Sequence, residues 1–245
     1  MRRVYLLLAL FVSAIFCSSC DDGSVTDPVY VDSSKTYRAQ LIGTFHGLNE
    51  WGSTYKLALA GFNDDSRYSV IQKDIPSHAD KAVPDTILLS GIPDGTEHVE
   101  LAVVNVLRQR IATLCSVDIE SGHDANDTIK IDLGEFDASP FGAVKTAVFH
   151  GSNTNCVMCH QGEKPAASLN LAADNVYDRL VNVYSSKSPD SLLVAPGDAS
   201  QSFLYQVITS GSTSLHYSHP GIFVEDNVKY LPSLIENWIN EGTKN

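Results

Sequence analysis

The chain has few positively charged residues for its length. Lysine and arginine number 17 against 29 aspartates and glutamates, which gives the 245 residues a formal net charge of −12. A chain without a basic cluster cannot neutralise many phosphates, and this argues against nucleic acid as a partner. For the same reason, any association with a membrane must depend on something other than surface charge.

Long hydrophobic runs are also scarce, and the clearest one lies at the start of the chain. Residues 4–16 carry no charge, are almost wholly apolar and follow Arg2 and Arg3. The run is too short to span a bilayer as a helix. A basic start followed by a short apolar stretch is typical of an export signal, so we expect residues 1–19 to be a signal peptide.

The end of this run resembles the lipobox of bacterial lipoproteins, in which small residues precede a lipidated cysteine. Ser18 and Ser19 precede Cys20, which would then be the first mature residue and carry the lipid. Residues 20–35 are polar and rich in turn formers, as expected of a flexible tether. Simple secretion and an uncleaved membrane helix are the alternatives. The lipoprotein interpretation predicts a protein anchored at the outer membrane, facing the periplasm or the cell surface.

Cysteine is used sparingly, and two of the five cysteines lie in one pentapeptide. Cys156-Val157-Met158-Cys159-His160 reads C-x-x-C-H, the pattern of covalent haem attachment. Two thiols three residues apart can each add to a haem vinyl group, and the adjoining imidazole can bind the iron. The pattern predicts one haem c, attached through Cys156 and Cys159 and ligated by His160.

A redox-active C-x-x-C pair and half of a zinc site are the alternatives for this motif. A structural zinc site needs a second pair of ligands at regular spacing, and the only other cysteine of the mature chain, Cys115, stands alone. Cys115 lies in an apolar stretch, where we expect a buried free thiol.

Residues 36–136 contain short stretches in which apolar and polar residues alternate, which is the period of β-strands. Glycine, proline, asparagine and aspartate separate these stretches at the spacing of a β-sandwich. We therefore predict an all-β sandwich of the immunoglobulin or fibronectin type III kind. Its strands are expected at 37–42, 55–59, 86–89, 99–106, 111–119 and 129–131.

After residues 137–140 the apolar period becomes helical. We expect one helix at 141–149, a second at 175–184 and a third that follows a capping box at Asp198 and ends before Gly211. A last helix is expected at 232–241, with Leu234, Ile235 and Trp238 facing inward. The change of period predicts a second domain at 140–245.

The motifs of residues 141–241 resemble the cytochrome c family, and more narrowly the haem domains of bacterial envelope lipoproteins of the Bacteroidota type. After C-x-x-C-H the shared segments are Leu169-Asn170-Leu171, Tyr177 to Val181, Pro196-Gly197-Asp198 and Trp238-Ile239. The resemblance implies an all-α cytochrome c domain that follows the sandwich in a multidomain chain.

The family places a Met-Pro pair where this chain has His219-Pro220. The mature chain would keep only Met158, which lies inside the attachment loop, so no methionine can be the distal ligand. The resemblance implies that His219 takes this position because it directly precedes the proline. His216 is the alternative, and water or an empty position is a third. Imidazole in place of thioether would lower the reduction potential.

These features predict a lipid-anchored c-type cytochrome that exchanges single electrons with redox partner proteins of the envelope. A haem enzyme with an open, peroxidase-like iron site is one alternative. A binding or sensory lipoprotein, in which the sandwich docks a partner, is the other. An imidazole on the distal side of the iron favours electron transfer over catalysis.

Overall fold

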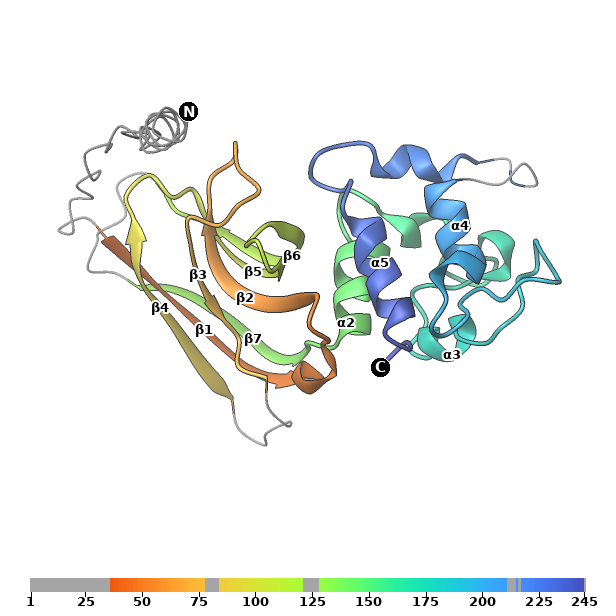
Figure 1. Cartoon of the computed structure of the whole chain (residues 1–245), viewed down its shortest axis with the longest axis horizontal. Coiled ribbons are helices and arrows are strands. Elements are labelled where there is room, and N and C mark those ends of the chain that lie inside the picture. The colour runs from red at the N-terminus through yellow and green to blue at the C-terminus, as the bar shows by residue number, and fades with distance from the viewer. Residues whose placement is uncertain (1–35, 78–83, 121–127, 211–214, 216, 245) are drawn as a thin grey trace, which may run out of the picture. The chain divides into compact units, whose positions relative to one another are not determined.

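The computed structural model describes residues 36–77, 84–120, 128–210, 215 and 217–244. These residues belong to one compact unit. Figure 1 shows its strands in the first half of the chain and its short helices in the second. Cys20 and the rest of the predicted signal peptide and tether, like His216, lie outside the described residues.

The first half forms two β-sheets. One has the strand order β4-β1-β7 and the other has the order β3-β2-β5-β6. All neighbouring strands are antiparallel except β1 and β7, which are parallel. The strands are β1 (Thr36–His46), β2 (Tyr55–Phe62), β3 (Ile71–Asp74), β4 (Asp85–Pro93), β5 (His98–Asn105), β6 (Arg110–Asp118) and β7 (Thr128–Asp137).

Apolar side chains from both sheets form the core of the β part. Ala39 and Leu41 of β1, Leu59 of β2 and Leu101 of β5 are completely buried. The alternation along β1 places every second side chain inward, which is the consequence of the two-residue period of a strand. The predicted β-rich N-terminal part is therefore present in outline.

The second half contains short helices. Helix α2 (Pro140–Val144) continues as a π-helical turn η2 (Lys145–Phe149), and α3 (Val176–Leu180), α4 (Phe203–Thr209) and α5 (Leu231–Asn240) follow. Ser139 caps α2, because its hydroxyl accepts a hydrogen bond of 2.9 Å from the Gly142 amide. The short 3₁₀-helices are η1 (Leu48–Glu50), η3 (Cys156–Met158), η4 (Ala166–Ser168), η5 (Ala199–Gln201) and η6 (His219–Phe223).

The predicted all-α cytochrome c domain at 140–245 is wrong. The longest helix there, α5, has ten residues, and α2 and α3 have only five each. Irregular loops and 3₁₀-turns make up much of the rest, and the two β-sheets are the main regular structure of the described chain.

The error is clearest at the helix predicted for 175–184. Helix α3 ends at Leu180, and Asn182 adopts a left-handed backbone conformation with φ 59° that a helix cannot contain. Val181 then forms a parallel bridge with Val194, and Tyr184 an antiparallel bridge with Leu192. The apolar spacing of this segment therefore belongs to a short helix followed by extended chain.

The strands and the helices share one cluster of buried side chains. Trp238 of α5 is 1% exposed and stacks on Phe141 of α2 with ring centres 4.8 Å apart. The Tyr55 hydroxyl of β2 donates a 3.1 Å hydrogen bond to Ser233 of α5. The helical segment thus rests on the β part through both apolar and polar contacts. None of the described helices is long and apolar enough to cross a membrane.

Candidate functional site

The C-x-x-C-H motif is wound into a single tight turn. The carbonyl of Cys156 accepts hydrogen bonds from the amides of Cys159 (3.3 Å) and His160 (3.1 Å). Two residues before the motif shape the approach to this turn. The Gly151 carbonyl accepts a 2.7 Å hydrogen bond from the Asn155 amide, and Asn155 has a left-handed backbone conformation with φ 47°. A Cβ on Gly151 would lie 2.2 Å from the Ala147 carbonyl oxygen, so only glycine permits this approach.

The two thiols of the motif are both free. Cys156 is half-buried against the core, whereas Cys159 is exposed. Burial raises the pKa of Cys156 to about 11. Redox-active C-x-x-C pairs instead work through a cysteine whose pKa is lowered. A thiol that stays protonated at neutral pH therefore disfavours the redox-pair alternative.

A zinc site at the motif is disfavoured by geometry. Among the described residues, the thiols of Cys156 and Cys159 form no cluster with other histidine, cysteine or carboxylate groups that could enclose a metal ion. Four close ligands are the rule for structural zinc. Cys115, on β6, is free as expected but only half-buried, packed against the core.

His160 is oriented by the loop that follows it. Its Nδ1 lies 3.2 Å from the carbonyl oxygen of Leu169, and the Leu171 amide donates to the His160 carbonyl at 2.8 Å. With Nδ1 as the donor to a carbonyl, Nε2 carries the free electron pair. Histidines that bind metals are commonly held by such a second hydrogen bond. The Leu169 carbonyl is a part of the site that no sequence pattern predicts.

The structure brings His219 next to His160. Their ring centres are 6.3 Å apart and their planes are tilted by 42°. His219 opens the 3₁₀-helix η6, with Pro220 fixing the backbone directly after it. The exposed ring of Tyr217 covers it edge-on at 5.2 Å. The histidine predicted as distal ligand thus lies opposite the predicted proximal one.

The spacing of the two rings is what a shared metal ion requires. Two imidazoles on opposite sides of an ion have centres about 6 Å apart, because each metal–nitrogen bond is about 2 Å long and each ring centre lies about 1 Å behind its nitrogen. The observed separation of 6.3 Å is compatible with one ion shared by the two rings, and it also falls in the range of about 4.5–7 Å at which aromatic rings contact each other directly.

The His219 ring is partly buried. Its Nδ1 is buried and makes no well-formed hydrogen bond to the described residues, although the Tyr217 carbonyl lies close enough to affect the pKa of the ring. Burial and the nearby His160 lower the pKa of His219, and the Tyr217 carbonyl acts weakly in the opposite direction. A lowered pKa favours the neutral imidazole, which is the form that binds metals.

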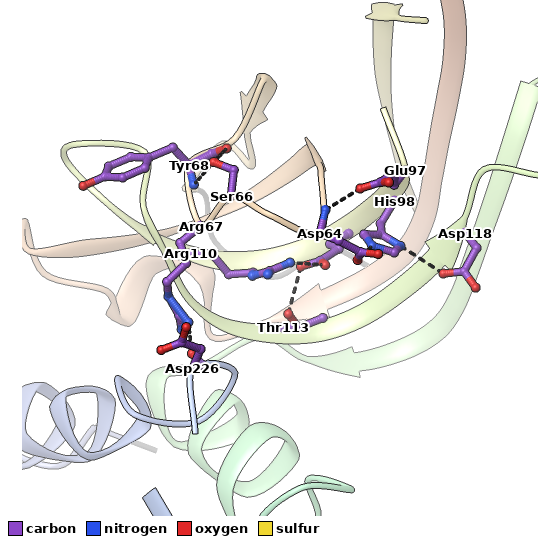
Figure 2. A network of polar contacts seen from close by, with 11 residues as sticks. Asp64, Ser66, Arg67, Tyr68, Glu97, His98, Arg110, Thr113, Asp118 and Asp226 are labelled. Atoms are coloured by element: carbon purple, nitrogen blue, oxygen red, sulfur yellow. Dashed lines mark hydrogen bonds and ion pairs between the residues drawn. The ribbon is translucent and has the colours of Figure 1, made fainter. Parts of the chain in front are cut away.

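A second polar group lies on the β part, shown in Figure 2. The ligand atoms of Asp64, Glu97 and His98 lie within 4.8 Å of one another, so they could in principle hold a cation. His98 Nε2 is 2.5 Å from Asp64, and Nδ1 is 3.1 Å from Asp118. Burial acts to lower the pKa of His98, but the bonds to the two aspartates outweigh it and raise the pKa. A histidine that hydrogen-bonds to two exposed carboxylates accounts for this group without a metal.

Comparison with known proteins adds no relatives. No protein-family model matches the chain, and no curated protein matches it significantly. The likeness to cytochromes c therefore depends on the motifs of this sequence.

Proposed function

We propose that this chain binds one haem c and carries single electrons. Cys156 and Cys159 would hold the haem through thioether bonds, and His160 and His219 would bind its iron. The observation that carries the proposal is the pair of opposed imidazoles, 6.3 Å apart, one of which directly follows the two thiols.

The chemistry of the donor groups supports this assignment. Both thiols are free rather than paired in a disulfide, and burial raises the pKa of Cys156 to about 11. His160 is oriented by the Leu169 carbonyl, and the buried Nδ1 of His219 makes no well-formed hydrogen bond to the described residues. When bound, haem supplies an iron that changes reversibly between the ferric and ferrous states. The residues of this chain would orient it and exclude water from the distal face.

Electron transfer is favoured over catalysis at an open iron. A second imidazole opposite His160 leaves no free position for peroxide or a small gas. Imidazole in place of a methionine thioether also favours a lower reduction potential. Both points argue for a carrier rather than a peroxidase-like enzyme.

We also propose that the protein works in the cell envelope. Lipid on Cys20 would hold it at the outer membrane, facing the periplasm or the cell surface, where it would exchange electrons with partner redox proteins. Support for this comes from the apolar start of the chain and the small residues before Cys20. It also agrees with haem attachment, which takes place outside the cytoplasm.

The decisive experiment is expression in a host that attaches haem c, followed by a haem stain of the denatured protein after electrophoresis. The wild-type band should stain because thioether bonds survive denaturation. Cys156→Ala or Cys159→Ala should weaken the stain, and the double variant should lose it. Cys115→Ala is the matched control and should stain fully. An unstained wild-type band would show that the proposal is wrong.

A further inference from the structure

We propose that Arg67, in the loop between β2 and β3, is a positioning residue for His219. Its target is residues 219–230, which we call the distal segment. By holding the far end of this segment, Arg67 would keep His219 opposite His160. This inference rests on the proposed function and assigns a role in it to the β part.

The backbone around Arg67 is firmly attached to the hairpin of β5 and β6. The Arg67 carbonyl accepts a 2.7 Å hydrogen bond from the Arg110 amide, and the Ser69 amide donates at 3.1 Å to the Arg108 carbonyl. Between them, Tyr68 and Gln109 form an antiparallel bridge. The backbone at Arg67 is therefore held to the second sheet by hydrogen bonds.

The side chain of Arg67 extends from this base to the distal segment. Its Nη1 donates a hydrogen bond to the carbonyl oxygen of Asp226, and Figure 2 shows the two residues meeting. Its guanidinium carbon lies 4.2 Å from the centre of the Tyr230 ring. A flat guanidinium can stack on an aromatic ring and donate to a carbonyl at the same time, whereas an ammonium group cannot reproduce this geometry.

The distal segment has little regular structure of its own. After the five residues of η6 it continues as turns until α5 begins. Helix α4 packs against η6 at one end of the segment, while Phe223 and Val228 are buried along it. Arg67 contacts the other end. A segment restrained at both ends presents His219 at a fixed place, and loss of one restraint would let the imidazole leave the iron more often.

The test compares the wild type with Arg67→Ala, Arg67→Lys and the control Arg38→Ala. Arg38 is an exposed arginine on β1, in the other sheet. The rate of cyanide binding to the ferric protein, at saturating cyanide, reports how often the distal ligand dissociates. We expect a rise of about tenfold for Arg67→Ala, a smaller rise for Arg67→Lys and no change for Arg38→Ala.

Hydrogen exchange gives a readout that does not depend on the iron. The amides of residues 219–230 should exchange faster in Arg67→Ala and at the wild-type rate in Arg38→Ala. If Arg67→Ala does not fold, Tyr230→Leu decides, because it removes the ring beneath the guanidinium while leaving the hairpin intact. It should raise both the cyanide rate and the exchange of the segment.

The outcomes separate this inference from the proposed function. Suppose that the wild type carries covalent, low-spin haem and that neither Arg67→Ala nor Tyr230→Leu changes the rate of cyanide binding. This result overturns the positioning role and leaves the haem proposal intact. A wild type without covalent haem overturns the proposed function, and the positioning role with it.

Discussion

The ion pair between Arg110 and Glu100 in the second sheet allows a sharp test of the β part. The Glu100 side chain is 4% exposed and that of Arg110 is 17% exposed, with Nη1 2.5 Å from the carboxylate. The Thr113 hydroxyl donates to the same carboxylate at 2.8 Å. The guanidinium also lies 4.7 Å from the centre of the Phe62 ring. We predict that Arg110→Met strongly destabilises the fold, because it leaves a buried carboxylate without a counter-charge.

The expected size follows from this burial. Removal of one partner of a buried ion pair costs about 3–5 kcal/mol in free energy of unfolding. Glu100 is the more buried partner, so loss of Arg110 should lie toward the upper part of this range. For a chain of this size the midpoint of thermal unfolding should fall by about 10 °C. Replacement of both charges leaves no buried ion, so Glu100→Gln with Arg110→Met should be less damaging than Arg110→Met alone.

Urea unfolding followed by circular dichroism gives the free energy of unfolding of the wild type, Arg110→Met, Glu100→Gln and the double variant. The coupling between the two sites is obtained from the double-mutant cycle. Lys56→Met is the control, because its 2.5 Å pair with Asp74 has both side chains nearly half exposed and should contribute under about 1 kcal/mol. Costs that simply add in the double variant, or a cost for Arg110→Met no larger than the control's, would refute the reasoning.

Three further predictions concern the histidines and the anchor. The raised pKa of His98 means that its bonds to two exposed aspartates stabilise the fold fully below its ordinary value of 6.5 and lose this effect as pH rises through the higher folded value. His98→Gln should therefore lower the free energy of unfolding by less than about 1 kcal/mol at pH 5.5 and leave it unchanged at pH 9; an equal loss at both pH values would contradict this. His219→Ala should turn a low-spin optical spectrum high-spin while His216→Ala leaves it low-spin; the reverse pattern would identify the wrong histidine. Cys20→Ala should move the protein from the membrane fraction to the soluble fraction, and unchanged retention would contradict lipid anchoring.

The strands were largely predictable because alternation of apolar and polar residues is a local property. All six expected strands coincide with observed ones, and β1, β4 and β7 extend well beyond the expected ranges. Strand β3 was missed because its four residues, Ile71 to Asp74, contain one apolar side chain and show no period. It exists because β2 offers it a partner, which is a tertiary effect.

The helical half was predicted less well, for a reason that lies in the length of its segments. Helix α5 matches its prediction because Leu234, Ile235 and Trp238 lie on one face, about one turn apart, and are buried together. A segment of five residues, such as α3, is too short to show a helical period. The bridge of Val181 to Val194 depends on contacts that local spacing does not contain.

At the candidate site, too, the sequence predicts the chemistry of the residues but not all of the contacts that place them. The residue types of the motif predict what Cys156, Cys159 and His160 can do, and the proline after His219 singles out that histidine. Arg67 precedes His219 by about 150 residues, and the sequence does not reveal that Arg67 contacts the segment that carries His219. Such a contact becomes visible only once the sheet fixes the backbone of Arg67. On the proposed role of Arg67, the β part, for which the sequence predicted no site, would support the segment that carries His219, and Arg67→Ala should disturb that segment before it disturbs the fold.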